Sequence, residues 1–357
     1  MGGGPARSPR QASVLRSVNG PGATGNRGGT APRSVVVLGG GGFLGRHIGS
    51  AFRRAGARTL SVSRNAPASA ASRAAALDLS TAPPERLAEI LTAERADVLV
   101  NAVGRVWGAS DAEMEDANAR LVRRLADCLA AMERPPRLIQ LGSIHEYGPG
   151  TPGSALAEEG EARPDTAYGR TKLLGTHTVL DAVNAHPQVE GVVLRVANAL
   201  GPGVPRGSLF GAVAHRLADA ARRPAVAPEP VVGMDAEHPA AGTVVLTMPA
   251  LRVCRDFVDV RDVADAVVAA ATVTATEVSG RIVNIGSGRP VLVRQLVERL
   301  VAMSGLSVRI DPAGESGGAG GGAALWQQLD ISLAHKLLDW SPRRAPDESL
   351  RDLLAAA

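Results

Sequence analysis

The chain has 357 residues, of which 45% are hydrophobic and 21% charged, enough for one large core and a smaller lobe. Its formal net charge is +4, but the first 33 residues contain five arginines and no acidic residue, so the remainder is close to neutral. This balance argues against a nucleic-acid-binding protein. Residues 1–33 are rich in Gly, Pro, Ser and Arg, which predicts a disordered tail.

The sequence lacks the features of a secreted, membrane-bound or metal-dependent protein. No stretch has the length and apolar character of a membrane span, and the N-terminal residues lack the hydrophobic segment of a secretory signal. Cys128 and Cys254 lie far apart and outside any metal-ligand spacing, so we expect two free thiols and no metal site. We therefore predict a cytoplasmic protein with no membrane contact.

From residue 34 onward, short aliphatic runs alternate with longer amphipathic segments. The predicted strands cover residues 34–38, 59–63, 98–101, 138–142 and 192–196, and the predicted helices cover 43–54, 84–92, 118–132 and 167–184. Strands that are apolar throughout and separated by helices are typical of an α/β fold with a doubly wound parallel sheet, the Rossmann type. Such a sheet binds ligands at the carboxyl ends of its strands.

The second half of the chain is less regular and predicts a smaller C-terminal lobe. Residues 34–200 are assigned to the Rossmann domain, and residues 201–357 mainly to a substrate-binding lobe. Within the latter, residues 256–290 are expected to return to the Rossmann domain through a helix at 260–271 and a strand at 281–285. A further helix is predicted over residues 291–304.

A glycine-rich segment follows the first predicted strand and opens the first predicted helix. Its glycines are Gly39, Gly42 and Gly45, with Phe43 and Leu44 in the first helical turn. Glycine permits the tight turn and the close approach of a pyrophosphate, which the free amides of a helix N-terminus then bind. The alternative is a flexible surface turn, but the flanking strand and helix favour a dinucleotide-binding loop.

The end of the second strand bears on the choice of cofactor. NAD enzymes of this architecture usually carry an acid there for the ribose hydroxyls, whereas this chain has Ser63 and Arg64. A guanidinium beside a hydroxyl suits a 2′-phosphate, with Arg46 as a second candidate, so NADP(H) is predicted ahead of NAD. The alternative for Arg64 is a solvated surface arginine.

Further cofactor contacts are predicted at the ends of later apolar runs. Asp78 is a candidate to bind the adenine amino group, although it is also typical of a plain turn residue. The remaining candidates are Leu79, Ala102, Val103 and Gly104.

The chain contains only two tyrosines and two lysines, and Tyr168 and Lys172 lie four residues apart on one predicted helix face. Reduction of a ketone by hydride also needs a proton, and a nearby ammonium favours ionisation of a phenol whose unperturbed pKa is about 10. Ser143 follows the strand at 138–142, where its hydroxyl can donate to a developing alkoxide. We predict Ser143, Tyr168 and Lys172 as the catalytic residues. Tyr168 and Lys172 are also predicted to contact the cofactor, because a compact ammonium can bond the nicotinamide ribose. The alternative for the pair is an ordinary surface contact.

These residues resemble the extended short-chain dehydrogenase/reductase family, in the branch that acts on nucleotide-activated sugars. The resemblance spans about residues 34–354 and is carried by GGGGFLG, NAVG, GSIHEYG, YGRTK, LRVANALGPG, RDFVDVRDVADAV, NIGSG and DWSP. It implies that Asn198 and Arg255 bind the diphosphate of a sugar nucleotide and that the protein forms a homodimer through the helices at 118–132 and 167–184. His145 and Glu146 are candidates for sugar contacts or, alternatively, ordinary loop residues.

Within that branch, dehydratases carry Thr, Asp and Glu where this chain has Ser143, Ile144 and His145, and epimerases retain NAD permanently. The resemblance is strongest to ketoreductases that reduce carbon 4 of dTDP-4-keto-deoxyhexoses in the biosynthesis of antibiotic sugars. The alternatives are an NAD-dependent epimerase and a non-catalytic dinucleotide sensor. One departure is a glycine-rich stretch at residues 311–324, where related enzymes often carry a second arginine for the diphosphate.

Overall fold

The computed structural model describes residues 1, 31–65, 73–222, 243–248, 251–312 and 326–357. The predicted disorder of the N-terminal tail and nearly all of the glycine-rich stretch lie outside the described residues.

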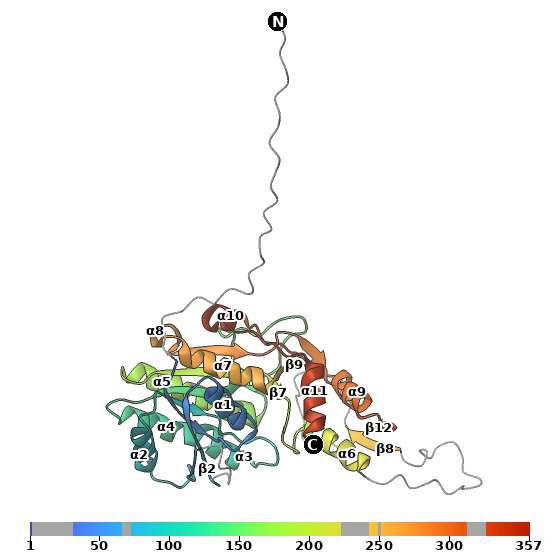
Figure 1. The fold of residues 1–357 in the computed structure, drawn as a ribbon, viewed down its shortest axis with the longest axis horizontal. Coiled ribbons are helices and arrows are strands. Elements are labelled where there is room, and N and C mark those ends of the chain that lie inside the picture. The colour runs from blue at the N-terminus through green and yellow to red at the C-terminus, as the bar shows by residue number, and fades with distance from the viewer. Residues whose placement is uncertain (2–30, 66–72, 223–242, 249–250, 313–325) are drawn as a thin grey trace, which may run out of the picture.

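A seven-stranded parallel sheet forms the centre of the larger lobe (Figure 1), in the order β10-β6-β5-β4-β1-β2-β3. Its strands are β1 (Ser34–Leu38), β2 (Arg58–Ser63), β3 (Arg73–Ala76), β4 (Val98–Asn101), β5 (Arg137–Ser143), β6 (Gly191–Val196) and β10 (Arg281–Ile285). The strand order reverses beside β1, so the carboxyl ends of β1 and β4 frame a crevice. The predicted doubly wound fold is confirmed.

Helices cover both faces of this sheet. Alternate residues of a strand point to opposite faces, and accordingly Val35 and Val37 belong to one buried cluster while Val36 and Leu38 belong to another. The first cluster is covered by α1 (Phe43–Arg54) and α7 (Val260–Thr272), and the second by α2 (Pro84–Glu94), α4 (Leu121–Ala130) and α5 (Ala167–Ala185). The helix α10 (Ser332–Leu338) also packs on the first cluster.

The smaller lobe has its own buried cluster, which includes Phe210, Leu246, Leu296 and Leu350. Its elements are α6 (Leu209–Ala221), β8 (Val244–Met248), α9 (Val293–Ser304), β12 (Val308–Pro312) and α11 (Pro346–Ala355). Between the lobes runs β9 (Cys254–Asp259), which pairs with β7 (Asn198–Leu200), β11 (Pro290–Leu292) and β13 (Trp326–Gln327). Short helical segments complete the chain, namely α3 (Asp111–Glu115), η1 (Asp116–Arg120), η2 (Ile144–Glu146) and α8 (Ala275–Val278).

Two predicted helices begin later than expected. Residues 291 and 292 belong to β11 because their backbone pairs with β9, and α9 begins only at Val293. Residues 118–120 form part of the π-helical turn η1, and α4 follows from Leu121. A π turn inserts one residue into the helical repeat and is often found at functional sites. Here it carries Asn118, whose contacts are described below.

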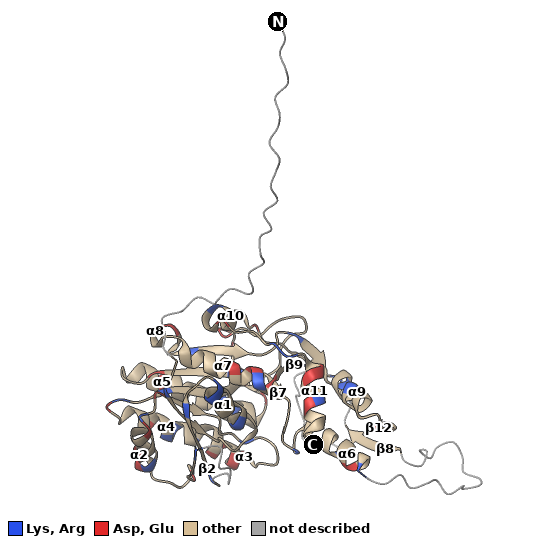
Figure 2. Ribbon diagram, in the orientation of Figure 1, with Lys and Arg blue, Asp and Glu red and all other residues tan. Residues whose placement is uncertain are grey.

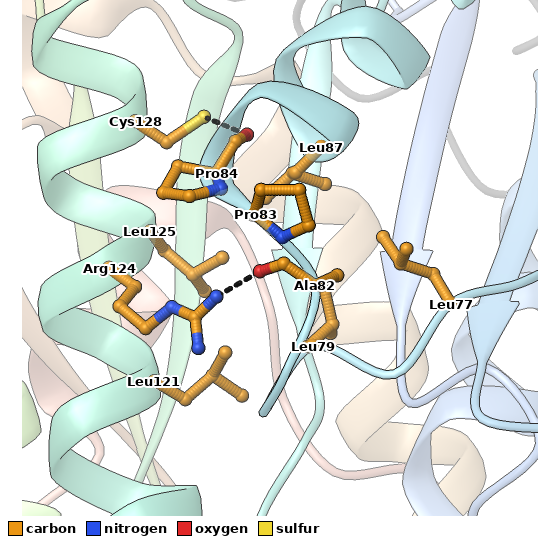
Figure 3. A pocket seen from close by; sticks show the side chains of 10 residues that line it. All are labelled: Leu77, Leu79, Ala82, Pro83, Pro84, Leu87, Leu121, Arg124, Leu125 and Cys128. Carbon is orange, nitrogen blue, oxygen red and sulfur yellow. Dashed lines mark hydrogen bonds between the residues drawn. The ribbon is translucent and has the colours of Figure 1, made fainter.

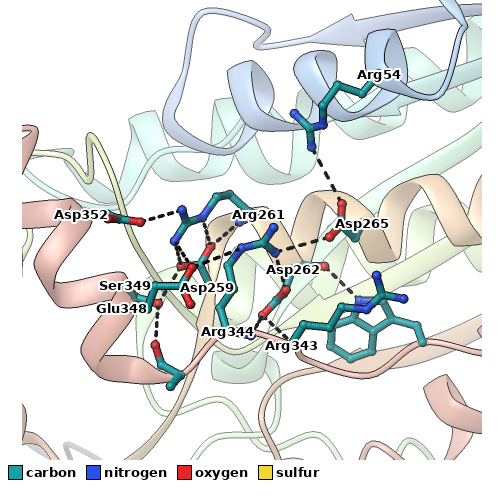
Figure 4. Close-up of polar contacts among 12 residues, drawn as sticks. Arg54, Asp259, Arg261, Asp262, Asp265, Arg343, Arg344, Glu348, Ser349 and Asp352 are labelled. Carbon is teal, nitrogen blue, oxygen red and sulfur yellow. Dashed lines mark hydrogen bonds and ion pairs between the residues drawn. The ribbon is translucent and has the colours of Figure 1, made fainter. Parts of the chain in front are cut away.

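A polar network joins the C-terminal helix α11 to the start of α7 (Figure 4). Asp259 caps α7, and its carboxylate also accepts hydrogen bonds from the Arg261 side chain and from Ser349 Oγ at 2.6 Å. Arg261 Nη1 lies 2.6 Å from Asp352 Oδ2. The buried Asp262 accepts from the backbone amides before α11 and pairs with Arg344. Acidic and basic residues are accordingly mixed along these two helices (Figure 2).

Across the described segments, every helix is too short or too polar to cross a lipid bilayer.

Candidate active site

The glycine loop after β1 has a geometry that only small residues allow. Gly39 has φ +72°, and its amide donates to Val62 O at 2.8 Å. A Cβ at Gly45 would lie 2.1 Å from Gly39 O, so α1 can approach the turn only because residue 45 is glycine. The helix begins at Phe43 without a side-chain cap on its first amides. Uncapped amides at a helix N-terminus beside a glycine turn fit the pyrophosphate of a dinucleotide.

The loop after β4 closes against this turn. Ala102 N donates to Leu38 O at 3.1 Å, and Ala102 O would lie 3.0 Å from a Cβ at Gly39. Asn101 Oδ1 accepts from Val103 N at 3.1 Å. Ala102, Val103 and Gly104 therefore lie beside the glycine loop, as the sequence predicts for a cofactor-binding segment.

Ser63 ends β2 on the same side of the sheet. A Cβ at Gly41 would lie 3.6 Å from Ser63 Oγ, which donates to Asn65 O at 2.6 Å. Arg64 is exposed. Asp78 accepts hydrogen bonds from Ser80 N and Oγ, which lower the pKa of its carboxyl, and Arg64 adds a smaller effect in the same direction. Arg64 and Asp78 thus occupy one corner of the crevice.

Two predicted cofactor residues point elsewhere. The Arg46 guanidinium donates to the backbone oxygens of Pro202 and Gly203, so it is engaged by the turn after β7 instead of lying with Ser63 and Arg64. Leu79 lines an apolar hollow between α2 and α4 (Figure 3). The hollow is also lined by Leu77, Ala82, Pro83, Pro84, Leu87, Leu121, Arg124, Leu125 and Cys128.

The predicted catalytic residues meet at the carboxyl end of β5. Ser143 is the last residue of that strand, and its side chain lies close enough to Tyr168, near the start of α5, to lower the pKa of the phenol. Lys172 lies one turn further along α5, is 5% exposed, and donates to the backbone oxygen of Leu141. Thr166 fixes the start of α5 by accepting from Gly169 N at 3.0 Å.

Burial perturbs both titratable groups of this trio. Desolvation raises the pKa of Tyr168 to about 12, against the opposing effect of the Ser143 hydrogen bond. Desolvation lowers the pKa of Lys172 to about 8, against the opposing charge of Glu146. In this state the phenol is protonated at neutral pH, as a proton donor must be, while the ammonium is held near its titration point.

Three predicted substrate residues gather beside Tyr168. The ring of His145 stands edge-on to that of Tyr168, with centroids 5.6 Å apart, and burial lowers the pKa of His145, so its imidazole is neutral at pH 7. Asn198 lies close enough to His145 to act on the pKa of its imidazole, and it donates to Asp256 O at 2.9 Å. Arg255, on the neighbouring strand β9, acts electrostatically on His145. A guanidinium, an amide and an imidazole thus lie on one side of the Tyr168 phenol.

Glu146 does not lie with these residues. Its side chain is fully buried, and its carboxylate accepts from Ser143 N, Thr176 Oγ1 and Arg195 Nε at 2.8, 2.8 and 2.7 Å. A carboxylate enclosed by three protein donors is not positioned to touch a sugar. The expected sugar contact of Glu146 is therefore wrong for this structure.

The sequence reasoning missed three residues near the site. Asn118 accepts from Arg105 N and donates to Thr171 Oγ1, joining the loop after β4 to α5. Arg195 is a buried cation on β6. Asp165 has one buried carboxylate oxygen without a hydrogen-bond partner among the described residues. A charged residue inside an otherwise apolar strand, as at Arg195, was the available signal.

Comparison with known proteins places this geometry in a family. A curated relative, the dTDP-6-deoxy-L-talose 4-dehydrogenase (NAD(P)(+)) of Kitasatospora kifunensis, is 40% identical over 328 residues, which are 92% of this chain and 96% of that protein.

Similar solved structures include a UDP-glucuronic acid 4-epimerase from Bacillus cereus in complex with UDP-glucuronic acid and NAD, with a TM-score of 0.73 at 19% identity over 90% of this chain and 98% of that one. RMD from Pseudomonas aeruginosa complexed with NADPH gives a TM-score of 0.70 at 21% identity, over 91% and 98% of the two chains. At these identities the structures support the fold alone. Residues 35–286 match the family model, and the chain belongs to the NAD dependent epimerase/dehydratase family.

Proposed function

We propose that this protein is an NADPH-dependent oxidoreductase that reduces the 4-keto group of a dTDP-4-keto-deoxyhexose. The observation that carries the proposal is the meeting of Ser143, Tyr168 and Lys172 at the end of β5 in a chain whose glycine loop fits a dinucleotide. When bound, the nicotinamide would supply the hydride. The protein then has to supply the proton, hold the carbonyl oxygen and bind the rest of the substrate.

The residues divide these tasks by their chemistry. Ser143 donates a hydrogen bond to the carbonyl oxygen as negative charge develops on it. Tyr168 gives its phenolic proton to the same oxygen, and the buried ammonium of Lys172 favours the phenolate that remains. Because Tyr168 is protonated at neutral pH, the site is ready for reduction before any substrate arrives.

The curated relative informs the choice of substrate and direction. Its name describes oxidation at carbon 4 of dTDP-6-deoxy-L-talose. The reverse of that hydride transfer is the reduction of a 4-keto-6-deoxyhexose, and which direction dominates depends on pH and on the cofactor ratio. Asn198 and Arg255 are proposed to hold the diphosphate of the substrate, and His145 to contact its sugar.

For the cofactor, we propose NADP(H). Arg64 is exposed beside Ser63 at the end of β2, where a 2′-phosphate would meet a guanidinium. Residues 34–200 and 256–290 would form the cofactor domain, and most of the remainder the substrate lobe. A cytoplasmic homodimer that acts in deoxysugar biosynthesis for antibiotics is the setting we propose.

The test is turnover of dTDP-4-keto-6-deoxyglucose and its 3,5-epimer, followed by the absorbance of NADPH and by chromatography of the sugar nucleotide. The proposal expects one mole of NADPH consumed per mole of substrate, and a product that is oxidised back with NADP⁺. An interconversion of epimers without net NADPH consumption, with cofactor that co-purifies, would instead identify an epimerase. Binding of NADPH without turnover would identify a sensor.

A further inference from the structure

Glu146 is a buried acid that contacts the backbone of the catalytic serine. Glu146 Oε1 accepts from Ser143 N, while Oε2 accepts from Thr176 of α5 and from Arg195 of β6. Thr176 lies one helical turn beyond Lys172 on the helix that also carries Tyr168. One carboxylate therefore connects the end of β5, the catalytic helix and the next strand of the sheet.

The surroundings of Glu146 are shaped for this carboxylate. A Cβ at Gly142 would lie only 2.6 Å from Glu146 Oε1, so the glycine before Ser143 makes the space that the acid occupies. The guanidinium of Arg195 is held from its other side by the ring of Tyr147, 4.4 Å from the ring centroid. Tyr147 in turn donates to Asn284 Oδ1 at 2.8 Å. The Glu146 carboxylate, the Nε of Arg195 and the Tyr147 hydroxyl therefore each have a hydrogen-bond partner within the protein.

The cluster and the catalytic lysine share a short piece of backbone. Lys172 donates to Leu141 O, and Glu146 accepts from Ser143 N two residues later. The titratable groups packed here are Glu146 of η2, Tyr147 directly after it, Arg195 of β6, and Tyr168 and Lys172 of α5. Arg195 is 3% exposed and Glu146 0% exposed at the side chain, so water screens this pair little.

We propose that Glu146 is a positioning residue for the reaction, which fixes Ser143 relative to α5 and keeps the ammonium of Lys172 in place beside Tyr168. The positioning follows from the geometry, because the Glu146 carboxylate is hydrogen-bonded to β5, α5 and β6 and so holds these elements in fixed relative positions. Its negative charge acts in the same sense, because it opposes the loss of the Lys172 proton on burial. The inference rests on the proposed function, but its test has a readout that needs no turnover.

That readout uses the two lysines of the chain, Lys172 and Lys336. Full-length protein labelled with ¹³C- and ¹⁵N-lysine gives two side-chain signals by NMR, and Lys336→Arg assigns them. In Glu146→Gln, the titration midpoint of Lys172 is expected to move down by about one pH unit. In parallel, kcat is expected to fall about tenfold with both KM values within twofold of wild type, and the basic limb of the kcat profile to move to lower pH.

Glu146→Asp is the conservative rescue. It keeps the charge but shortens the side chain, so the Lys172 midpoint should return toward wild type while kcat recovers only in part. Asp262→Asn is the matched control, because Asp262 is also a buried acid paired with an arginine, Arg344, but on α7 away from Tyr168. It should lower the melting temperature without moving the Lys172 midpoint or the pH profile.

A Glu146→Gln protein that folds and has an unchanged Lys172 midpoint overturns the inference, whatever its activity. If that variant does not fold, Thr176→Val removes only one donor to the carboxylate, and kcat is then expected to fall about fivefold. An unchanged kcat in Thr176→Val would also overturn it. Absence of ketoreductase activity in the wild type would reject the proposed function alone, since the NMR titration still reports on Glu146 and Lys172.

Discussion

The ammonium of Lys172 donates to the backbone oxygen of Leu141, two residues before the catalytic Ser143. This bond holds the lysine against β5, inside the sheet edge and out of contact with water. The ammonium therefore keeps its charge only to the extent that Leu141 O and the nearby Glu146 offset the loss of hydration. Two measurable properties follow from this position.

The first prediction concerns pH. Burial lowers the pKa of Lys172 to about 8, so reductive kcat should fall as pH rises through that value and the ammonium is lost. Lys172 has the opposite effect on the free energy of unfolding. Between about pH 8 and the unfolded value of 10.5 the unfolded chain binds more protons, so this lysine makes the free energy of unfolding rise with pH.

Initial rates with NADPH between pH 6 and 10 test the first effect. The Lys172→Met variant provides the control for the second, because its unfolding free energy should lack the contribution that rises above pH 8. A reductive rate that stays constant from pH 7 to 10 would contradict the assignment of Lys172.

The second prediction concerns the proton donor. Tyr168→Phe keeps the ring that stands edge-on to His145 but removes the hydroxyl. Loss of a general acid typically costs about 10² to 10⁴ in kcat. We expect the dissociation constant for NADPH, measured by fluorescence, to change much less than kcat, because the glycine loop that fits the pyrophosphate is left intact. A variant that retained more than a tenth of wild-type kcat would show that another group donates the proton.

The sequence was sufficient to predict the sheet, because its central strands are mostly aliphatic and the glycine loop follows the first of them. It also predicted the meeting of Ser143 with Tyr168, since the ends of parallel strands share an edge. It failed for Glu146, which follows Ser143 by three residues and faces inward toward Arg195. The three-residue spacing between Ser143 and Glu146 does not reveal whether the short helical turn directs the Glu146 side chain inward or toward the site.

The small lobe was harder to predict for a related reason. Its strand β9 pairs with segments that begin at Asn198, Pro290 and Trp326, and these partners are up to about 130 residues apart along the chain. Strands of two or three residues have too little periodicity to be recognised locally. Their position is determined by the pairing itself, which no local pattern encodes.

The third prediction concerns the cofactor. If Arg64 binds a 2′-phosphate, Arg64→Ala should raise KM for NADPH about tenfold and leave KM for NADH within twofold. Arg134→Ala, an exposed arginine in the turn between α4 and β5, is the control and should change neither constant. Equal effects of Arg64→Ala on NADPH and NADH, or none on either, would argue against a role for Arg64 in cofactor selection.

The fourth prediction compares alanine substitutions at two glycines of the loop, Gly41 and Gly45. A methyl group at Gly45 would collide with Gly39 O at 2.1 Å, and this oxygen belongs to the backbone and cannot rotate away. At Gly41 the nearest atom would be Ser63 Oγ at 3.6 Å, an ordinary contact. We therefore expect Gly45→Ala to lower the free energy of unfolding by about 1–3 kcal/mol, the usual cost of a forced overpacking, and Gly41→Ala to change it by less than about 0.5 kcal/mol.

Urea unfolding followed by circular dichroism gives both values, and NADPH titration of the folded variants adds a second comparison. Displacement of α1 from the turn moves the amides at its N-terminus, so Gly45→Ala should also weaken cofactor binding by more than tenfold. Because Gly41 faces the second strand and not the helix, its variant separates crowding by a methyl group near the cofactor from displacement of the helix. Equal stability of the two variants would contradict this prediction. A Cβ contact of 2.1 Å with backbone atoms can be relieved only if α1 moves, and in a closely packed lobe that movement lowers the stability.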